Sequence, residues 1–313
     1  MNLLESITVE TGLRAPDAER IIASAPKRYK QYAIPKRDGG LRIIAQPSRE
    51  LKLLQRLLTD QWLKSLPVHI CATAYVRKKN ILENALLHRG SRAILKLDFE
   101  SFFPSLRVTD WKRFVEGKKC PWDGQGDLAR VTNILFWGQG QSRPHCLSIG
   151  APTSPIVSNL LMFDLDEQFF KRASELGVAY TRYADDITAS AATIEQIVEF
   201  EKYVRAALRS CRSPRLKVNE KKRGIYTQGQ RRMVTGLILT PVGKVSIGRE
   251  RKRKISTLLH LFSLGRLDVN RIGYLKGMLG FSIANEPDFL GRLRRKYGNA
   301  VVDRVLDLKL PRR

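Results

Sequence analysis

The chain has few acidic residues for its length, and this shortage limits the kinds of protein it can be. Its 313 residues include 30 Asp or Glu against 56 Lys or Arg, which gives a formal net charge of +26. Such an excess repels itself unless an anionic partner or salt neutralises it, and nucleic acid is the commonest such partner. A basic ribosomal-type protein or a membrane-surface protein could have the same balance, so charge predicts a class of partner but no reaction.

Cysteine is also scarce, and no two cysteines form a C-x-x-C pair. This spacing argues against a zinc knuckle and against a disulfide framework. The only hints of metal ligands are His69 with Cys71 and His145 beside Cys146, and a thiol used as a small apolar residue is the commoner case. The four cysteines are Cys71, Cys120, Cys146 and Cys211.

Long apolar runs are absent too, and none reaches the roughly 20 residues of a membrane-spanning helix. The N-terminus MNLLESITVETGL has acids where a signal peptide needs bases. We therefore expect a soluble, cytoplasmic protein with no membrane partner.

Local signals predict helices and a hairpin in the N-terminal part. A short helix should begin near Pro16 and end near Ser24. The runs YKQYAIP and LRIIAQP should then pair around the turn 36–40, whose Asp-Gly-Gly supplies positive φ angles. Ser48 can cap a following helix with one apolar face, formed by Leu51, Leu54, Leu58 and Trp62.

Further β-rich runs predict a sheet that gathers acids at its edge. Residues 93–98, AILKLD, predict a buried strand ending on an acid, and VAYTRYA with ITASAA predicts a hairpin with Asp185 and Asp186 at its tip. The runs 216–219 and 233–239 predict two more strands, and KVSIG could pair nearby.

The remaining elements are expected to be helices. One should start at Pro152 or Pro155 and another should cover residues 194–210. The first should have an apolar face made of Ile156, Leu160 and Phe163. From about residue 249 the pattern is helical and basic: residues 240–313 hold 17 Lys or Arg against 6 Asp or Glu. Strands mixed with helices on one face indicate an α+β domain, followed by a basic helical one.

Three of the scarce acids end or begin apolar strands, namely Asp98, Asp185 and Asp186. Acids crowded at a sheet edge repel one another and need compensating cations. Two divalent ions satisfy that need and clamp the attacking and leaving oxygens of phosphoryl transfer, and Mg²⁺ suits carboxylates combined with substrate phosphates. Taken alone, however, an Asp-Asp turn is as well explained by an ordinary surface hairpin.

The flanking residues resemble the reverse transcriptase family in five motifs that occur in the family's order. YADD at 183–186 resembles its active-site hairpin, and LKLDFESFFPSL at 96–107 resembles its first catalytic motif. The other three are GAPTSPIVSNL, LKVNEKKRGI and MVTGLIL. The resemblance implies a right-hand polymerase with fingers (1–92), a ferredoxin-like palm (93–239) and a helical thumb (240–313). It also implies catalysis by Asp98, Asp185 and Asp186 with two Mg²⁺ ions.

The same resemblance implies roles for residues that meet the incoming dNTP. Phe103 would be the steric gate that excludes a ribose 2′-OH, so that the product is DNA; the alternative is a core residue beside Phe102. Lys36 and Arg42 would contact the triphosphate, with a solvated basic hairpin as the alternative. Gly150 would lie at the nucleotide, and Lys222 near the leaving pyrophosphate. One departure is Ile149, which stands where the family commonly has Gln and so lacks an amide that would touch the nucleotide's sugar or the template.

Two further strings resemble bacterial retron reverse transcriptases: N-A-x-x-H at 84–88 and V-T-G at 234–236. This resemblance implies a cognate structured noncoding RNA as partner. It also implies a branched, RNA-linked single-stranded DNA product primed from a guanosine 2′-OH, and an anti-phage role with an effector protein. RNA contacts would come from Asn84, His88 and basic thumb residues, which are Arg251, Lys252, Arg253, Lys254, Arg294 and Arg295. The alternatives are a catalytically lapsed RNA-binding protein and a 3′-primed enzyme like those of group II introns.

Overall fold

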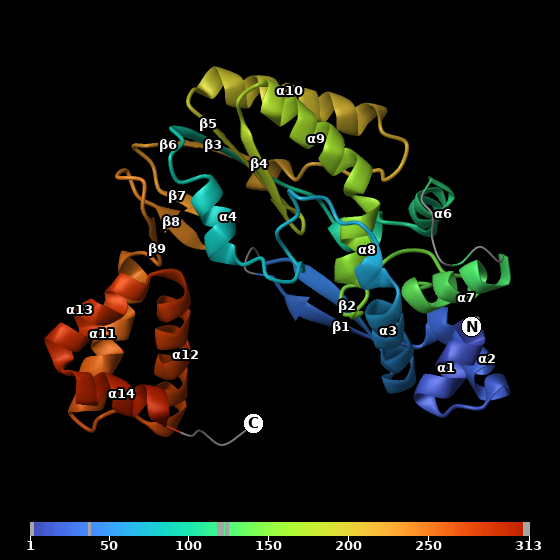
Figure 1. Cartoon of the computed structure of the whole chain (residues 1–313), viewed down its shortest axis with the longest axis horizontal. Helices are drawn as coiled ribbons and strands as arrows, with labels where there is room; N and C mark the ends of the chain where they lie inside the picture. Colours follow the sequence, from blue (N-terminus) through green and yellow to red (C-terminus); the bar gives the residue numbers. More distant parts are fainter. Residues whose placement is uncertain (1–2, 37–38, 118–121, 123–124, 309–313) are drawn as a thin grey trace. The chain divides into compact units, whose positions relative to one another are not determined.

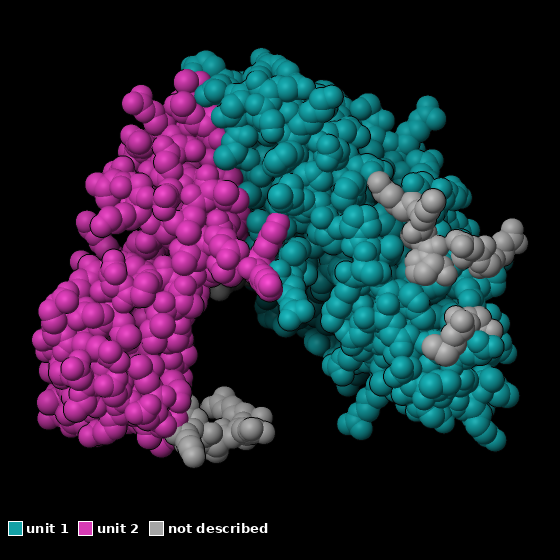
Figure 2. Space-filling view, in the orientation of Figure 1, with its two compact units in different colours: residues 1–77, 95–189, 195–224 teal, residues 78–94, 190–194, 225–313 magenta. Residues whose placement is uncertain are grey.

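The chain forms two compact units in a computed structural model that describes residues 3–36, 39–117, 122 and 125–308. Unit 1 comprises residues 1–77, 95–189 and 195–224, and unit 2 comprises residues 78–94, 190–194 and 225–313 (Figure 2). Each unit is therefore assembled from segments far apart in the sequence. The predicted fingers and palm are both divided between the two units, whereas the whole predicted thumb range lies in unit 2.

Unit 1 begins with helices and a hairpin, as predicted. Pro16 lies in the first turn of α2, and the Ser48 hydroxyl accepts a hydrogen bond from the Leu51 amide at the start of α3. Leu51, Leu54 and Leu58 are fully buried, which confirms the apolar face of α3. The elements are α1 (Leu3–Thr11), α2 (Ala15–Ser24), the 3₁₀ helix Ala25–Lys27, the paired strands β1 (Tyr29–Pro35) and β2 (Leu41–Pro47), α3 (Arg49–Gln61) and the 3₁₀ helix Leu63–Ser65.

A four-stranded sheet carries the three acids, with the strand order β4-β5-β3-β6. Its strands are β3 (Ala93–Asp98), β4 (Ala179–Tyr183), β5 (Asp186–Ala191) and β6 (Gly224–Thr227). Tyr180 of β4 contacts Phe169 and Phe200, with ring centroids 6.0 and 5.7 Å apart. These aromatics belong to α9 (Phe163–Glu175) and α10 (Ile194–Ser210), so both helices cover the same face of β4 (Figure 1).

The other helices of unit 1 are short. Pro155 lies in the first turn of α8, as predicted. Its buried apolar face is formed by Val157 and Leu160, whereas Ile156 is partly exposed and Phe163 begins α9, so the expected face was partly wrong. These elements are α5 (Phe102–Ser105), α6 (Val108–Gly117), α7 (Gln125–Leu135), α8 (Ser154–Leu161) and the 3₁₀ helix Glu220–Lys222.

Unit 2 combines a small sheet with helices around one apolar core. That core joins Ala85, Val234, Leu259, Leu279 and Val302, among others. The sheet has the order β7-β8-β9. The elements are α4 (Ile81–Leu87), β7 (Arg232–Val234), β8 (Leu237–Leu239), β9 (Val245–Ser246), α11 (Arg249–Ser263), α12 (Val269–Asn285), α13 (Pro287–Tyr297) and α14 (Asn299–Asp307). The predicted helical pattern beyond residue 249 is confirmed.

Two predicted strands were wrong. Residues 233–239 form a hairpin and not one strand, because Thr235 (φ 46°) and Gly236 (φ 82°) turn the chain between β7 and β8. Residues 216–219 form no strand; Val218 makes a single bridge to Phe99, and a 3₁₀ helix follows. No helix among the described residues is long and apolar enough to cross a membrane.

Candidate active site

The three acids come together through the sheet and one tight turn of unit 1. Asp98 is the last residue of β3, Asp186 is the first of β5, and Asp185 precedes it in the turn. Ala184 turns the chain with a φ of 58°, a conformation that costs a non-glycine residue about 1–2 kcal/mol. The Phe99 amide donates to the Asp185 carbonyl at 3.1 Å, which links the end of β3 to the turn at Ala184 and Asp185.

Burial and mutual repulsion dominate the electrostatics of the acids. Burial raises the pKa of Asp185, and the charge of Asp98 raises it further. Burial also raises the pKa of Asp186 to about 6, with Asp185 and Asp98 adding to the shift and Lys96 opposing it. Both carboxylates would therefore gain from an additional cation.

Asp98 already has two partners from the segment that follows α10. The Lys222 Nζ donates to Asp98 Oδ2 at 2.8 Å, and the Asn219 Nδ2 donates to Oδ1 at 3.3 Å. Burial disfavours the charged form of Lys222, but the hydrogen bond to Asp98 and the nearby acids raise its pKa overall. Lys222 thus contacts one of the three acids, while its predicted place near the leaving pyrophosphate stays a prediction. Asn219 was missed because its spacing from Asp98 has no local signal.

Among the described residues, no group of three or more acid, His or Cys side chains is arranged so that it could hold a metal ion by itself. Lys222 offsets part of the charge of the acids through its ion pair with Asp98. Carboxylate oxygens are nevertheless the donor type that Mg²⁺ prefers, and Mg²⁺ usually completes its coordination with water and substrate phosphates.

Arg42 and Tyr75 also lie within electrostatic reach of the acids. Arg42, on β2, lowers the pKa of Asp185, although burial outweighs this effect. Tyr75 has a φ of 62° and is about half exposed; burial and then the charge of Asp185 raise its pKa. Tyr75 was not predicted from the sequence. Lys36 is exposed at the end of β1, while residues 37–38 of the predicted turn lie outside the described residues.

The two adjacent phenylalanines differ in burial. Phe102 is 4% exposed and stacks on Phe99 with ring centroids 5.8 Å apart, so it belongs to the core. Phe103 is only half-buried. The predicted gate residue is therefore the one of the pair that retains an accessible surface.

The backbone of Gly150 packs directly against the backbone of β2 in the β1–β2 hairpin. A Cβ at this position would lie 3.0 Å from the Ala45 carbonyl oxygen, and the φ of 125° favours glycine. The neighbouring Ile149 carbonyl accepts a hydrogen bond from the Ala45 amide at 2.9 Å. The backbone of Ile149 thus fastens the segment to β2 regardless of its side chain.

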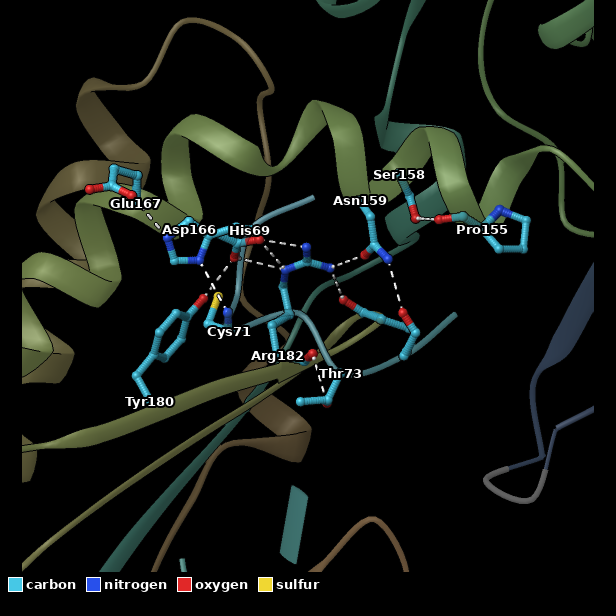
Figure 3. Close-up of polar contacts among 12 residues, drawn as sticks. His69, Cys71, Thr73, Pro155, Ser158, Asn159, Asp166, Glu167, Tyr180 and Arg182 are labelled. Atoms are coloured by element: carbon cyan, nitrogen blue, oxygen red, sulfur yellow. Dashed lines mark hydrogen bonds and ion pairs between the residues drawn. The ribbon is translucent and has the colours of Figure 1, made fainter. Parts of the chain in front are cut away.

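A buried polar network, which sequence reasoning also missed, lies behind the catalytic turn (Figure 3). Arg182 and Asp166 are fully buried and form a bidentate ion pair with distances of 2.6 to 3.1 Å. The Arg182 Nη1 donates to the Ala184 carbonyl at 3.0 Å and to Asn159 Oδ1 at 3.1 Å. Asn159 in turn donates to the Ala74 carbonyl at 2.9 Å.

The predicted hint of a metal site at His69 and Cys71 has another explanation. His69 pairs with Glu167 Oε2 at 2.9 Å, and its Nδ1 accepts the Cys71 amide at 3.2 Å. Burial raises the pKa of the Cys71 thiol well above its usual range, which disfavours the thiolate that binds metals. Both residues belong to the packing beneath β4.

Comparison with known proteins assigns this site to a family. The family model described as reverse transcriptase (RNA-dependent DNA polymerase) matches residues 34–264. The chain is 36% identical over 306 residues to the Retron Ec83 reverse transcriptase of Escherichia coli, covering 96% of this chain and 97% of that protein. It is 30% identical to the Retron Ec73 reverse transcriptase of the same organism, covering 95% of this chain and 94% of that one. The chain belongs to the reverse transcriptase family.

The chain is thus an RNA-directed DNA polymerase of the retron type, as the motifs predicted. Its mixture of helices and sheet is that of the right-hand polymerases. The structure of apo telomerase from Candida tropicalis is similar, with a TM-score of 0.51 and 12% identity, covering 89% of this chain and 61% of that one. This similarity concerns the fold alone.

Within this retron reverse transcriptase, the two retron strings lie against each other in unit 2. The Thr235 hydroxyl donates to the Ile81 carbonyl at the start of α4, at 3.1 Å. Asn84 and His88 are both buried, and His88 Nδ1 contacts Ser190 Oγ at 2.7 Å. Because neither side chain is exposed, neither can contact RNA directly in this conformation. Any effect of Asn84 or His88 on RNA binding would therefore be indirect, through the conformation of α4.

The six basic thumb candidates divide into two groups. Arg251, Lys252 and Arg294 contact the protein itself: the Gly236 carbonyl, Glu286 and Asp303, respectively. The other three are exposed, and Lys254 lies over the Tyr274 ring at 4.7 Å. These three are Arg253, Lys254 and Arg295.

Proposed function

We propose that this reverse transcriptase copies a cognate structured noncoding RNA into a branched, RNA-linked single-stranded DNA, primed from the 2′-OH of an internal guanosine. The observation that carries the proposal is the meeting of the two retron strings: Thr235 of V-T-G bonds to the helix that holds N-A-x-x-H, and Val234 shares its core with Ala85. The high identity to two retron enzymes along the whole chain supports the same conclusion.

The catalytic centre would be formed by Asp98, Asp185 and Asp186. In this proposal the three carboxylates hold two Mg²⁺ ions, which would polarise the primer hydroxyl and stabilise charge on the phosphates. The raised pKa values of Asp185 and Asp186, and the repulsion of both by Asp98, support this assignment, because a bound cation relieves both effects. Lys222 would leave Asp98 when metal and substrate bind, and would then be available to the leaving pyrophosphate.

Residues around the acids would position the dNTP. Arg42 and Lys36 would bind its triphosphate; the electrostatic coupling of Arg42 to Asp185 supports the first of these. Phe103 would exclude a ribose 2′-OH, and its half-buried ring supports this over a core role. Gly150 would let the nucleotide approach the backbone next to β2.

RNA binding would involve unit 2. The exposed Arg253, Lys254 and Arg295 are the proposed phosphate contacts, and Arg251, Lys252 and Arg294 would act mainly by shaping that surface. Such contacts are salt-sensitive, since each displaces counterions from the nucleic acid. Asn84 and His88 would contribute by fixing α4.

Nucleic acid bound in vivo tests the proposal most directly. The protein and its Asp185→Asn/Asp186→Asn variant would be purified from cells carrying the native flanking DNA. The bound material would then be treated with ribonuclease, deoxyribonuclease and a debranching enzyme. We expect a short DNA that is 2′–5′ linked to RNA in the wild type and absent from the variant.

Two other outcomes would contradict the proposal in different ways. Unbranched DNA would indicate an ordinarily 3′-primed enzyme. RNA alone in both samples would indicate a protein that binds RNA without copying it.

An anti-phage role with an effector protein is the wider hypothesis, and it rests on the retron assignment. Deletion of the gene, compared with the Asp185→Asn/Asp186→Asn allele, should raise plating efficiency for at least one phage in a broad panel. Unchanged plating across the panel would refute the role.

A further inference from the structure

The catalytic turn adopts a strained conformation that its own sequence does not favour. Ala184 has a φ of 58° and is almost completely buried, although alanine rarely adopts the left-handed region. A strained residue at an active site persists only when surrounding contacts hold it. The contact made by the Ala184 carbonyl is a hydrogen bond from Arg182 Nη1 at 3.0 Å.

The same guanidinium reaches a second strained position. Its Nη1 also donates to Asn159 Oδ1, and the Asn159 amide donates to the carbonyl of Ala74. The next residue is Tyr75, with a φ of 62°, which lies within electrostatic reach of Asp185. Arg182 therefore links the backbone at Ala184 directly, and the backbone at Ala74 through the Asn159 side chain. Figure 3 shows Arg182 between Asp166 and Asn159.

Asp166 makes this arrangement possible. Its two oxygens accept Arg182 Nε and Nη2, which orients the planar fork so that Nη1 faces Asn159 and Ala184. Lysine could keep the charge at this position, but its three donors lie on one nitrogen and could not reproduce the bonds that Nε, Nη1 and Nη2 of Arg182 make to Asp166, Asn159 and Ala184. An apolar pair of similar volume is often at least as stable as a buried ion pair, so stability alone is a weak reason for this one.

We infer that Arg182, held by Asp166 and linked to Asn159, is a positioning residue for the catalytic acids. These three residues, the Arg182 network, hold the Ala184 turn and the Ala74–Tyr75 segment in fixed relation. Asp185 and Asp186 are thereby kept in the arrangement that binds cations. Arg182 touches neither substrate nor metal and acts only through the backbone.

Hydrogen exchange of backbone amides tests this inference without metal, RNA or dNTP. In the Arg182→Lys variant we expect exchange in residues 183–187 and 73–76 to rise by about tenfold, the loss expected for a hydrogen bond in a buried site. Asn159→Ala should affect mainly 73–76. Tyr180→Phe is the matched control: it removes a 2.9 Å bond to the same Asp166 carboxylate but has no link to Ala184, and it should leave both segments unchanged.

A second readout rests on the proposed metal-binding role of the acids. Mn²⁺ affinity, measured by electron paramagnetic resonance in the absence of nucleic acid, should fall about 10–100-fold in Arg182→Lys, as for other residues that orient metal ligands. The turnover number should fall with it, while binding of a primer–template in chelator stays at the wild-type level. Asp185→Asn reports separately whether the acids bind the ion at all.

The outcomes test the positioning role of Arg182 separately from the proposed metal-binding role of the acids. Equal exchange in Arg182→Lys, Tyr180→Phe and wild type would overturn the positioning role whatever the acids bind. Increased exchange confined to Arg182→Lys and Asn159→Ala would support it even if Asp185→Asn left Mn²⁺ binding unchanged, a result that would refute only the metal assignment. If Arg182→Lys instead increased amide exchange uniformly across unit 1, Arg182 would be a residue that stabilises the whole unit. That result would also overturn the inference.

Discussion

Two β-hairpins of this protein contain, in their turns, a non-glycine residue with a positive φ angle. In each turn an arginine side chain donates a hydrogen bond to a backbone carbonyl. In unit 1 the turn contains Ala184, and the arginine is Arg182. In unit 2 the turn contains Thr235 and Gly236, and Arg251 Nη1 donates to the Gly236 carbonyl at 2.5 Å. The two arginines differ in burial. The comparison indicates that an arginine bonded to a strained turn can belong either to a rigid interior or to a partly exposed region that tolerates change.

Arg182 is fully buried and neutralised by Asp166, whereas Arg251 is half-buried and lies over the Phe281 ring at 5.1 Å. The first turn is thus fixed on several sides in the interior. The second is held by two bonds to backbone carbonyls, from Arg251 to Gly236 and from the Thr235 hydroxyl to Ile81, and its arginine is partly exposed. We expect the first to tolerate no change and the second to tolerate several.

The largest expected effect concerns the acids beside the first turn. Asp98→Asn removes one of the three charges, and if it removes several kcal/mol of transition-state stabilisation, DNA synthesis should fall by at least about a thousandfold. Primer extension in a single turnover measures this. The control Asn219→Ala removes only a hydrogen bond to Asp98 and should cost about tenfold or less. Equal losses in both variants would contradict a metal-binding role for the carboxylate.

The second effect compares the two arginines directly. Arg182→Met leaves Asp166 buried without its cation and should lower the free energy of unfolding by about 3–5 kcal/mol. Arg251→Met removes the bonds to the Gly236 and Ile247 carbonyls and the contact with the Phe281 ring but leaves no buried charge unpaired, so it should cost less, about 1–3 kcal/mol. Chemical denaturation followed by fluorescence checks both values. The double variant Arg182→Met/Asp166→Leu should recover part of the loss, and no recovery would contradict the argument from the unpaired charge.

A third comparison uses pH, which should affect unit 2 through His88. Burial lowers the pKa of His88, on helix α4 next to the second turn, to about 4. The folded state therefore favours neutral His88. Its stabilising contribution is fully present above pH 6.5 and is lost as the pH falls towards 4, by about 3 kcal/mol at most.

The variant His88→Gln should lack this dependence. The difference in unfolding free energy between wild type and variant should change between pH 7 and pH 4, while contributions of Asp185 and Asp186, which have the opposite sign, cancel in the comparison. A constant difference over this range would show that folding does not lower the pKa of His88, and would contradict this prediction.

The smallest expected effect is at the second turn itself. Thr235→Asn replaces a β-branched residue by one that tolerates positive φ, but it removes the hydroxyl bond to Ile81. These opposing changes should nearly cancel, leaving thermal stability within about 1 kcal/mol of wild type. A much larger loss would mean that the Thr235–Ile81 bond is essential to unit 2.

Local sequence signals predicted the elements whose stability is local. Ser48 caps α3, β1 and β2 pair as a hairpin, and α10 covers residues 194–210 as its apolar period indicated. They failed for residues 233–239, since the left-handed conformation of Thr235 is held by Ile81, which lies 154 positions earlier in the chain. They failed for 216–219 because that run makes only one bridge, to Phe99.

The candidate site shows the same limit. Family motifs located the three acids, and the strand ends bring them together as expected. Asn219, Tyr75 and Arg182 could not be found this way, because each acts through contacts between distant segments. The sequence does not distinguish Arg182 from the other residues among the 56 Lys and Arg. Its burial and its ion pair with Asp166 are visible only in the folded structure.

Cys71 gives the protein a built-in chemical reporter of opening motions. Its amide and carbonyl take part in the hydrogen bonds beneath β4, the second of them to Arg182, and its thiol is almost completely buried with a strongly raised pKa. Alkylating reagents attack the thiolate, so labelling of Cys71 must wait until this region opens to solvent. Partly exposed Cys211 should react before Cys71. The labelling rate of Cys71 would then measure how often this part of unit 1, next to Arg182, opens to solvent.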